Sequence, residues 1–321
     1  MTRYRATAGL AVAAVLVAVL AALVGAAATG PSDARPQRQQ KAAVPVAAPV
    51  RAASAPAPLR GTLPGGRTRV FGGNRFLVAY YGTAGSGALG VLGEDAPERM
   101  QRRLARAAAP FGGAGRPVQP VDELIVTIAD RHPGEDGDHN HDISRRQVRS
   151  YIEAAHRHGA LLVLDLQPGT ADFLSVARRW GWALRDPWVG LALDPEWRMS
   201  RGGVPGRRIG AVGAAEVNRV SAWLSRAVTR RRLPEKLFLL HQFRRDMVVH
   251  PERIRARAGL AMVQHVDGFG TPQQKRATYA AVARPRQFTM GFKLFYDEDV
   301  HQMSARAVRG LRPRVRFVSF Q

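Results

Sequence analysis

The chain has 321 residues, a formal net charge of +23 and no cysteine. Its length allows one large domain or two small ones, and the lack of cysteine excludes disulfides, thiol catalysis and a lipidated cysteine anchor. The charge favours a polyanion: nucleic acid, anionic lipid or an acidic wall polymer. A bias of composition explains it equally well, because only four of the 48 basic residues are lysines. The sequence contains neither basic residues interleaved with aromatic residues nor the ligand spacing of a zinc finger, so we expect no nucleic-acid partner.

Residues 1–28 have the features of an export signal. Arg3 and Arg5 precede an uncharged apolar run from Ala8 to Ala28, which ends in small residues. This pattern is typical of a cleaved signal peptide, but the run is also long enough, at about 20 residues, to remain as a membrane anchor. In both cases we expect the remainder to be exported, either secreted or held at the outer face of the cytoplasmic membrane.

Residues 29–70 are dominated by Ala, Pro, Arg and Gln and show no hydrophobic period. The prolines favour an extended segment, and we interpret this stretch as a disordered linker between the N-terminal segment and the remaining chain.

From Phe71 onward, short apolar runs alternate with amphipathic segments. Ser144 with Gln147 forms a capping box for a helix that Gly159 ends. Thr271 and Pro272 open another helix, and the apolar face of 217–228 indicates a third. Pro97 begins a fourth, and residues 251–258 are the weakest helix prediction. The predicted strands are 75–82, 122–130, 160–169, 189–197, 236–243, 260–270, 288–299 and 315–321.

Strands that alternate with helices in this number predict a (β/α)8 TIM-like barrel over residues 71–321. The alternative is a doubly wound open sheet, which uses the same alternation with fewer strands. The first strand is not followed by a Gly-x-Gly-x-x-Gly turn, so we expect no dinucleotide, and no other cofactor is indicated.

Nearly every predicted strand ends in a polar or ionisable residue. In 160–169, Asp165 and Gln167 alternate with leucines, and Asp194 and Glu196 end the next strand in the same way. Because successive side chains point to opposite faces, the leucines should pack on helices and the acids should point into the barrel mouth. Active sites of such barrels lie there. The alternative is a set of salt-bridged loop caps.

The segment "LDPEW" resembles the Asp-x-Glu motif that ends the fourth strand in (β/α)8 glycoside hydrolases of the family 25 lysozyme and family 18 chitinase kind. The resemblance implies that Glu196 is the proton donor and that Asp194 supports it or orients the substrate. The aspartates that precede the motif in chitinases are absent here. The first strand carries Tyr80 and Tyr81 where family 25 enzymes have an aspartate.

Glycosidic cleavage needs a carboxylic acid near the leaving oxygen and a second carboxylate or amide to support charge at the sugar carbon. Glu196 fits the acid, and we expect the charge of Asp194 to raise its pKa. The second carboxylate is predicted among Asp267, Asp165 and Asp297. The expected partner is a glycan, together with an anionic cell-wall polymer. Candidate substrate contacts are Tyr81, Gln167, Trp197, His241, His265 and Lys293.

Two other functions fit the same residues. The first is a glycan-binding barrel without catalysis, which needs aromatic side chains but no paired acids. The second is a metal-dependent hydrolase that uses the histidine-rich segment 132–142 with His241 and His265. Because 132–142 contains turn-forming glycines, a solvated loop is the simpler interpretation, and no metal site is predicted.

Overall fold

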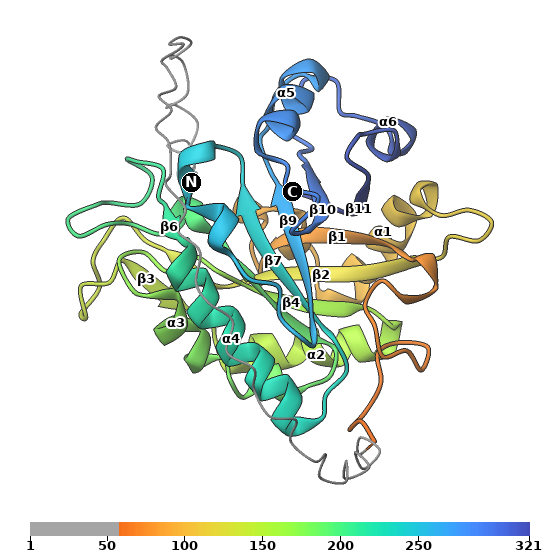
Figure 1. Ribbon diagram of the computed structural model, residues 1–321, viewed down its shortest axis with the longest axis horizontal. Coiled ribbons are helices and arrows are strands. Elements are labelled where there is room, and N and C mark those ends of the chain that lie inside the picture. The colour runs from red at the N-terminus through yellow and green to blue at the C-terminus, as the bar shows by residue number, and fades with distance from the viewer. Residues whose placement is uncertain (1–57) are drawn as a thin grey trace, which may run out of the picture. The chain divides into compact units, whose positions relative to one another are not determined.

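The computed structural model describes residues 58–321, which contain a closed barrel of eight parallel strands (Figure 1). The ring runs β1-β11-β10-β9-β7-β5-β4-β2, and pairing of β1 with β2 closes it. The predicted barrel is confirmed, and the open sheet is excluded. The strands are β1 (Phe76–Thr83), β2 (Val118–Ala129), β4 (Leu161–Leu166), β5 (Val189–Leu193), β7 (Lys236–Gln242), β9 (Leu260–Val266), β10 (Thr289–Leu294) and β11 (Val315–Phe320).

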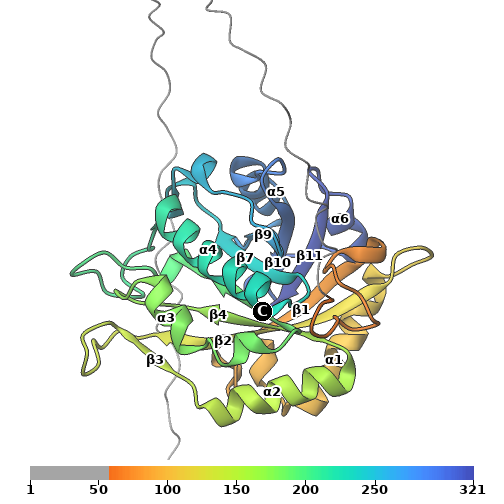
Figure 2. The ribbon, with the colours of Figure 1, turned by 60° about the horizontal axis from the view of Figure 1, so that its bottom comes forward.

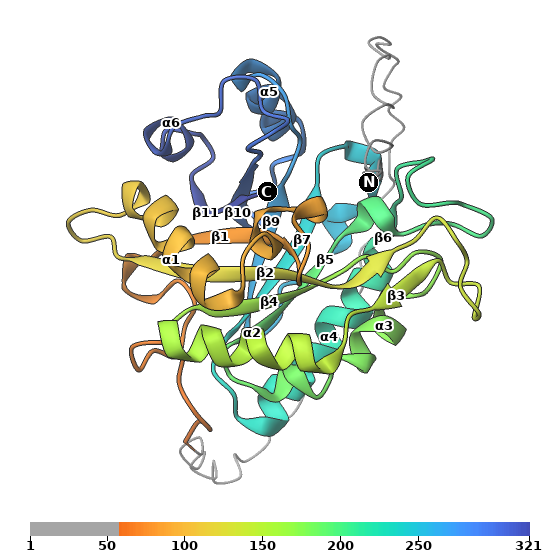
Figure 3. The same ribbon diagram turned by 180° about the vertical axis from the view of Figure 1, so that it is seen from behind.

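Helices lie outside the ring of strands (Figures 2 and 3). Three short strands lie outside it as well: β3 (Asn140–Asp142) pairs antiparallel with β2, and β6 (Val212–Gly213) pairs with β8 (Val248–Val249). The α-helices are α1 (Pro97–Ala108), α2 (Arg145–His158), α3 (Phe173–Arg179), α4 (Ala214–Arg231), α5 (Pro272–Val282) and α6 (Ala305–Arg309).

The predicted helix ends at α2 and α5 are confirmed. Ser144 and Thr271 each form a reciprocal capping box, and Gly159 ends α2 with a left-handed φ of 66°. The predicted helix at 251–258 is wrong, because the structure has only a 3-10 turn at Pro251–Arg253. After Pro251, Ile254 is the one buried apolar side chain of this segment. A single buried side chain provides too little packing to hold a helix against the barrel.

The period of two along the strands divides the core into two parts. Leu162, Leu164 and Leu166 pack outward with the helices, whereas Leu161 and Val163 pack inside the barrel. This alternation fixes the direction of every later side chain in each strand. Beyond the apolar interior layer, the inward positions at the carboxyl ends carry polar side chains instead.

The amino-terminal end of the barrel is covered by residues that we expected to belong to the linker. Leu63 and Val70 are buried among the interior apolar side chains, and the backbone N–H of Val70 donates to the carboxylate of Glu235 over 2.8 Å. The compact unit therefore begins at Pro58 rather than at Phe71. Two buried apolar anchors in an Ala- and Pro-rich stretch create no period, so the pattern could not show them.

The predicted signal or anchor at 1–28 and most of the predicted linker lie outside the described residues. Within residues 58–321, none of the helices has the length and apolar character needed to cross a membrane.

Candidate active site

Polar side chains from all eight barrel strands, or from the residues directly after them, meet at the carboxyl-terminal end of the barrel. All are almost completely buried, with exposed fractions between 0% and 7%. We call this set the mouth cluster. It consists of Tyr81, Glu123, Asp165, Asp194, His241, His265, Asp267, Lys293 and Ser319.

His241 lies at the centre of the mouth cluster. Its Nδ1 is 2.8 Å from Asp267 Oδ2, and its Nε2 is 3.0 Å from Glu123 Oε1. Two carboxylate acceptors require both ring nitrogens to donate, which is possible only for the imidazolium form. Burial alone would lower the pKa of His241, but the hydrogen bonds to Asp267 and Glu123 outweigh it and raise the pKa well above its usual value.

Glu123 is the functional residue that sequence reasoning missed. It lies inside β2, next to Asp122, and the two acids face opposite sides of the sheet. Asp122 packs outward and accepts a hydrogen bond from Gln101 over 2.6 Å, whereas Glu123 points at His241 and His265. The signal was the period of two within the strand, which requires one member of an adjacent acid pair to point inward.

His265 differs from His241 in charge state. Its Nε2 lies 3.0 Å from Ser319 Oγ, and its Nδ1 lies 3.4 Å from Glu123 Oε1. Its ring centroid is 4.7 Å from that of His241. Burial is the largest influence and lowers its pKa; the charge and hydrogen bonding of Glu123 oppose this effect, but the charges of His241 and Lys293 add to it, and the net shift is downward. Consequently, His265 is the neutral member of the histidine pair.

Tyr81, Asp165 and Gln167 form one wall of the mouth. The Tyr81 hydroxyl donates to Asp165 Oδ2 over 2.9 Å, and Gln167 Nε2 donates to the Tyr81 oxygen over 3.3 Å. Lys293 Nζ lies 3.3 Å from the centre of the Tyr81 ring, a cation–π contact. Burial raises the pKa of Asp165, and the negative charge of Glu123 adds to this effect.

Asp194 has a structural role at the end of β5. Its Oδ1 accepts the backbone N–H of Glu196 over 3.1 Å and so caps the 3-10 turn Pro195–Trp197. This turn presents Glu196 and Trp197, both half-buried, at the mouth. Burial raises the pKa of Asp194 well above its usual value, and the neighbouring acids Asp165, Glu196 and Asp267 raise it further.

Glu196 has a raised pKa, but not for the reason that we expected. Burial is the largest cause and the charge of Asp267 the second, and together they raise the pKa of Glu196 to about 7. Asp194 does not contribute, because a carboxyl group that keeps its own proton has no charge with which to repel. The charged neighbour of Glu196 is therefore Asp267, directly after β9, an electrostatic interaction that the Asp-x-Glu spacing did not indicate.

Asp267 is held in the opposite protonation state. Burial would raise its pKa, but the hydrogen bond from His241 and the charge of that ring lower it below the usual value. One carboxylate oxygen is fixed by His241, and the other, Oδ1, has no hydrogen-bond partner within residues 58–321. Glu196 and Asp267 thus form a carboxyl pair with one proton donor and one anion.

Other predicted residues do not join the mouth cluster. Asp297 is exposed and takes part in no side-chain hydrogen bond or ion pair within the described chain. Segment 132–142 is a mainly exposed loop that ends in the short strand β3, where His141 Nδ1 lies 3.4 Å from Asp130 Oδ2. Next to the mouth cluster, the buried Lys275 forms an ion pair with Asp299 over 2.8 Å. Lys275 also donates hydrogen bonds to the carbonyl oxygens of Gly268 and Lys293, and these contacts fix the loops after β9 and β10.

Two groups of side chains within residues 58–321 place metal-ligand atoms within 4.8 Å of one another: Glu123, His241 and His265, and Asp194, His241 and Asp267. Neither includes the histidine-rich loop. His241 belongs to both, and each of its ring nitrogens also lies within hydrogen-bond distance of a carboxylate oxygen. A histidine binds a metal through a nitrogen without a proton, so His241 would have to give up one of these two hydrogen bonds to hold an ion.

No protein-family model matches the chain, and the curated proteins include no match to it.

Proposed function

We propose that this protein is an exported glycoside hydrolase that acts on a cell-envelope or extracellular glycan, with Glu196 as the general acid and Asp267 as the second carboxylate. The observation that carries the proposal is the opposite perturbation of these two groups: the pKa of Glu196 is raised to about 7, whereas that of Asp267 is lowered. Two carboxyl groups whose environments move their pKa values apart are suited to acid and base roles in one reaction.

The buried charges are arranged to keep this assignment near neutral pH. Asp194 holds its proton and Glu196 does so below about pH 7, His265 is neutral, and the cations His241 and Lys293 face the carboxylates. Near-balance of charge is required in a desolvated site, because an unpaired ion is costly to bury. The proton that Glu196 keeps is the one that the leaving oxygen of a glycoside requires.

The free oxygen of Asp267 gives the second carboxylate its role. With Oδ2 held by His241, Oδ1 supports the positive charge that develops at the sugar carbon. Glu123 Oε2 and Asp165 Oδ1 are two further buried acceptors without a donor in the described chain. Sugar hydroxyl groups supply donors of this kind, and Trp197 at the rim supplies an aromatic face.

The test is a screen of wall glycans and chitin-type oligosaccharides with the wild-type protein, followed by Glu196→Gln and Asp267→Asn on the best substrate. General acid catalysis contributes about 10²–10⁴-fold, so Glu196→Gln should reduce turnover by that factor while binding persists. The wild-type rate should fall as pH rises through about 7, where Glu196 loses its proton. Asp297→Asn, an exposed acid after β10, is the matched control and should retain the wild-type rate.

Equal rates for wild type and Glu196→Gln would refute the catalytic assignment. Glycan binding without turnover in either protein would favour the non-catalytic glycan-binding barrel. The alternative is a metal-dependent hydrolase, with the ion held by one of the two groups of side chains that share His241. It predicts a stoichiometric bound metal and a hydrolysis rate that a chelator abolishes.

A further inference from the structure

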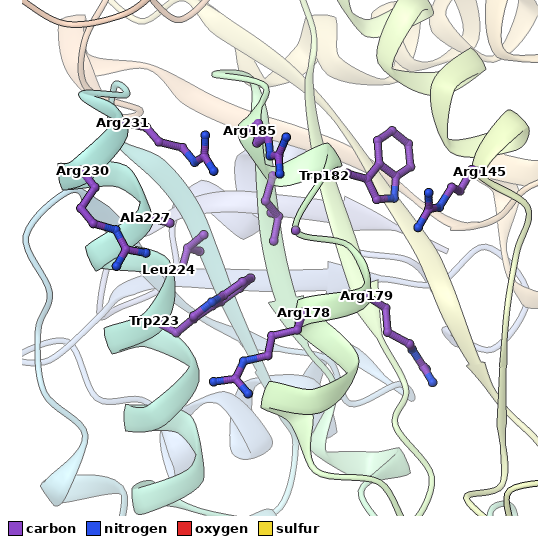
Figure 4. A pocket seen from close by; sticks show the side chains of 12 residues that line it. Arg145, Arg178, Arg179, Trp182, Arg185, Trp223, Leu224, Ala227, Arg230 and Arg231 are labelled. Carbon is purple, nitrogen blue, oxygen red and sulfur yellow. The ribbon is translucent and has the colours of Figure 1, made fainter.

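A cavity of about 330 Å³ lies on the helical surface, between α3 with its following turn and the last part of α4 (Figure 4). It shares no residue with the mouth cluster. Two tryptophans, Trp182 and Trp223, form part of its wall, and no acidic residue lines it. The cavity is also lined by six arginines: Arg145, Arg178, Arg179, Arg185, Arg230 and Arg231.

The charges of this cavity are almost uncompensated. Of its arginines only Arg179 forms ion pairs within residues 58–321, with Asp142 over 3.0 Å and more distantly with Asp138. In Figure 4 the side chain of Arg178 extends from α3 toward α4, beside Trp223. Gathering guanidinium groups without a counter-charge is unfavourable through mutual repulsion, and a bound anion removes that cost.

Two simpler explanations account for only part of the pattern. Basic residues in the last turn complement a helix dipole, which explains Arg178 in α3 and Arg230 in α4. The helix dipole does not explain Arg145, which is the first residue of α2, where a positive charge is unfavourable. It also does not explain Arg185, which lies in a short 3-10 turn. An arginine-rich composition explains many arginines, but not a wall that excludes acids.

The tryptophans add recognition features. The guanidinium groups of Arg145 and Arg149 stack over the Trp182 ring at 5.8 and 5.4 Å from its centre, which holds Arg145 in place. The indole N–H of Trp182 is buried and has no hydrogen-bond partner in the described chain.

We propose that this cavity binds a ligand carrying several phosphate groups. Planar guanidinium groups match phosphate oxygens with paired hydrogen bonds, and the volume is that of a small-molecule site. The arginines come from three separate segments of the chain, so a single phosphate does not reach them all. A soluble polyphosphate and an array of phospholipid headgroups share this chemistry.

The test measures binding of inorganic tripolyphosphate to the full chain by calorimetry at low salt. The double variant Arg230→Gln/Arg231→Gln should bind about tenfold more weakly or worse, because two charge-assisted contacts are lost. The matched control, Arg207→Gln/Arg208→Gln, removes the same charge from an exposed loop and should change the affinity by less than about twofold. Both variants should remain folded, because all four side chains are exposed, and Arg230→Gln/Arg231→Gln should lose no more than the small helix-dipole contribution of two exposed charges.

Equal weakening in both double variants, or no binding of tripolyphosphate to the wild type, would overturn the proposal. Sedimentation with phosphatidylglycerol vesicles identifies the source of the phosphate. Vesicle binding that only Arg230→Gln/Arg231→Gln weakens supports lipid headgroups, whereas tripolyphosphate binding with equal vesicle binding by all three proteins supports a soluble phosphate ligand.

Discussion

The raised pKa of Glu196 should make the protein less stable at high pH, and Glu196→Gln should remove that cost. In the folded state the pKa is about 7, against a usual value of 4.5. The folded protein therefore holds this proton more tightly than the unfolded chain, and its stability falls as pH rises from about 4.5 through 7. The difference corresponds to at most about 3 kcal/mol, and partial exposure of Glu196 reduces it to about 1–2 kcal/mol.

The assay is urea unfolding of both proteins between pH 4 and pH 8.5. Below about pH 4.5 the two should be equally stable, because glutamine has the shape and hydrogen bonding of protonated glutamate. The stability advantage of Glu196→Gln should then grow with pH and level off above about 7. Asp297→Asn, the exposed control, should show no such growth. A constant difference across the range, or a Glu196→Gln variant that is less stable at high pH, would refute the reasoning.

Two further predictions concern the surroundings of the mouth. Lys275→Met should reduce the free energy of unfolding by about 3–5 kcal/mol, because it leaves the fully buried Asp299 without its cation. Adding Asp299→Asn should recover part of that loss in the same urea titration, and no recovery would contradict the ion-pair explanation. His139→Ala with His141→Ala should change stability by about 1 kcal/mol or less, as expected for an outer loop. The metal content of both proteins is measured by elemental analysis. A metal that is bound to the wild type and lost from the double variant would contradict the prediction.

Local signals in the sequence were sufficient for the framework of the fold. Ser144 and Thr271 marked helix starts because capping involves only three or four neighbouring residues. The alternation in 160–169 placed Asp165 inside the barrel because the period of two is a property of the strand itself.

Relations between distant strands could not be predicted in the same way. The pKa of Glu196 depends on Asp267, whose position relative to β5 follows from barrel closure and not from spacing along the chain. Glu123 could not be recognised from the strand ends, because it lies within β2, six residues before the end of that strand. Leu63 was assigned to the linker because one apolar anchor in a proline-rich stretch leaves no periodic signal.

The pairing of β1 with β11 has a consequence for when the mouth cluster is assembled. Leu77 lies opposite Phe317, so the ring is joined by residues from nearly opposite ends of the described chain. Such closure is slow, because the entropy of a very long loop is lost before the contacts form. Ser319, the partner of His265, is on that same last strand. A chain that is still being synthesised therefore lacks an assembled mouth cluster until β11 is available to pair with β1.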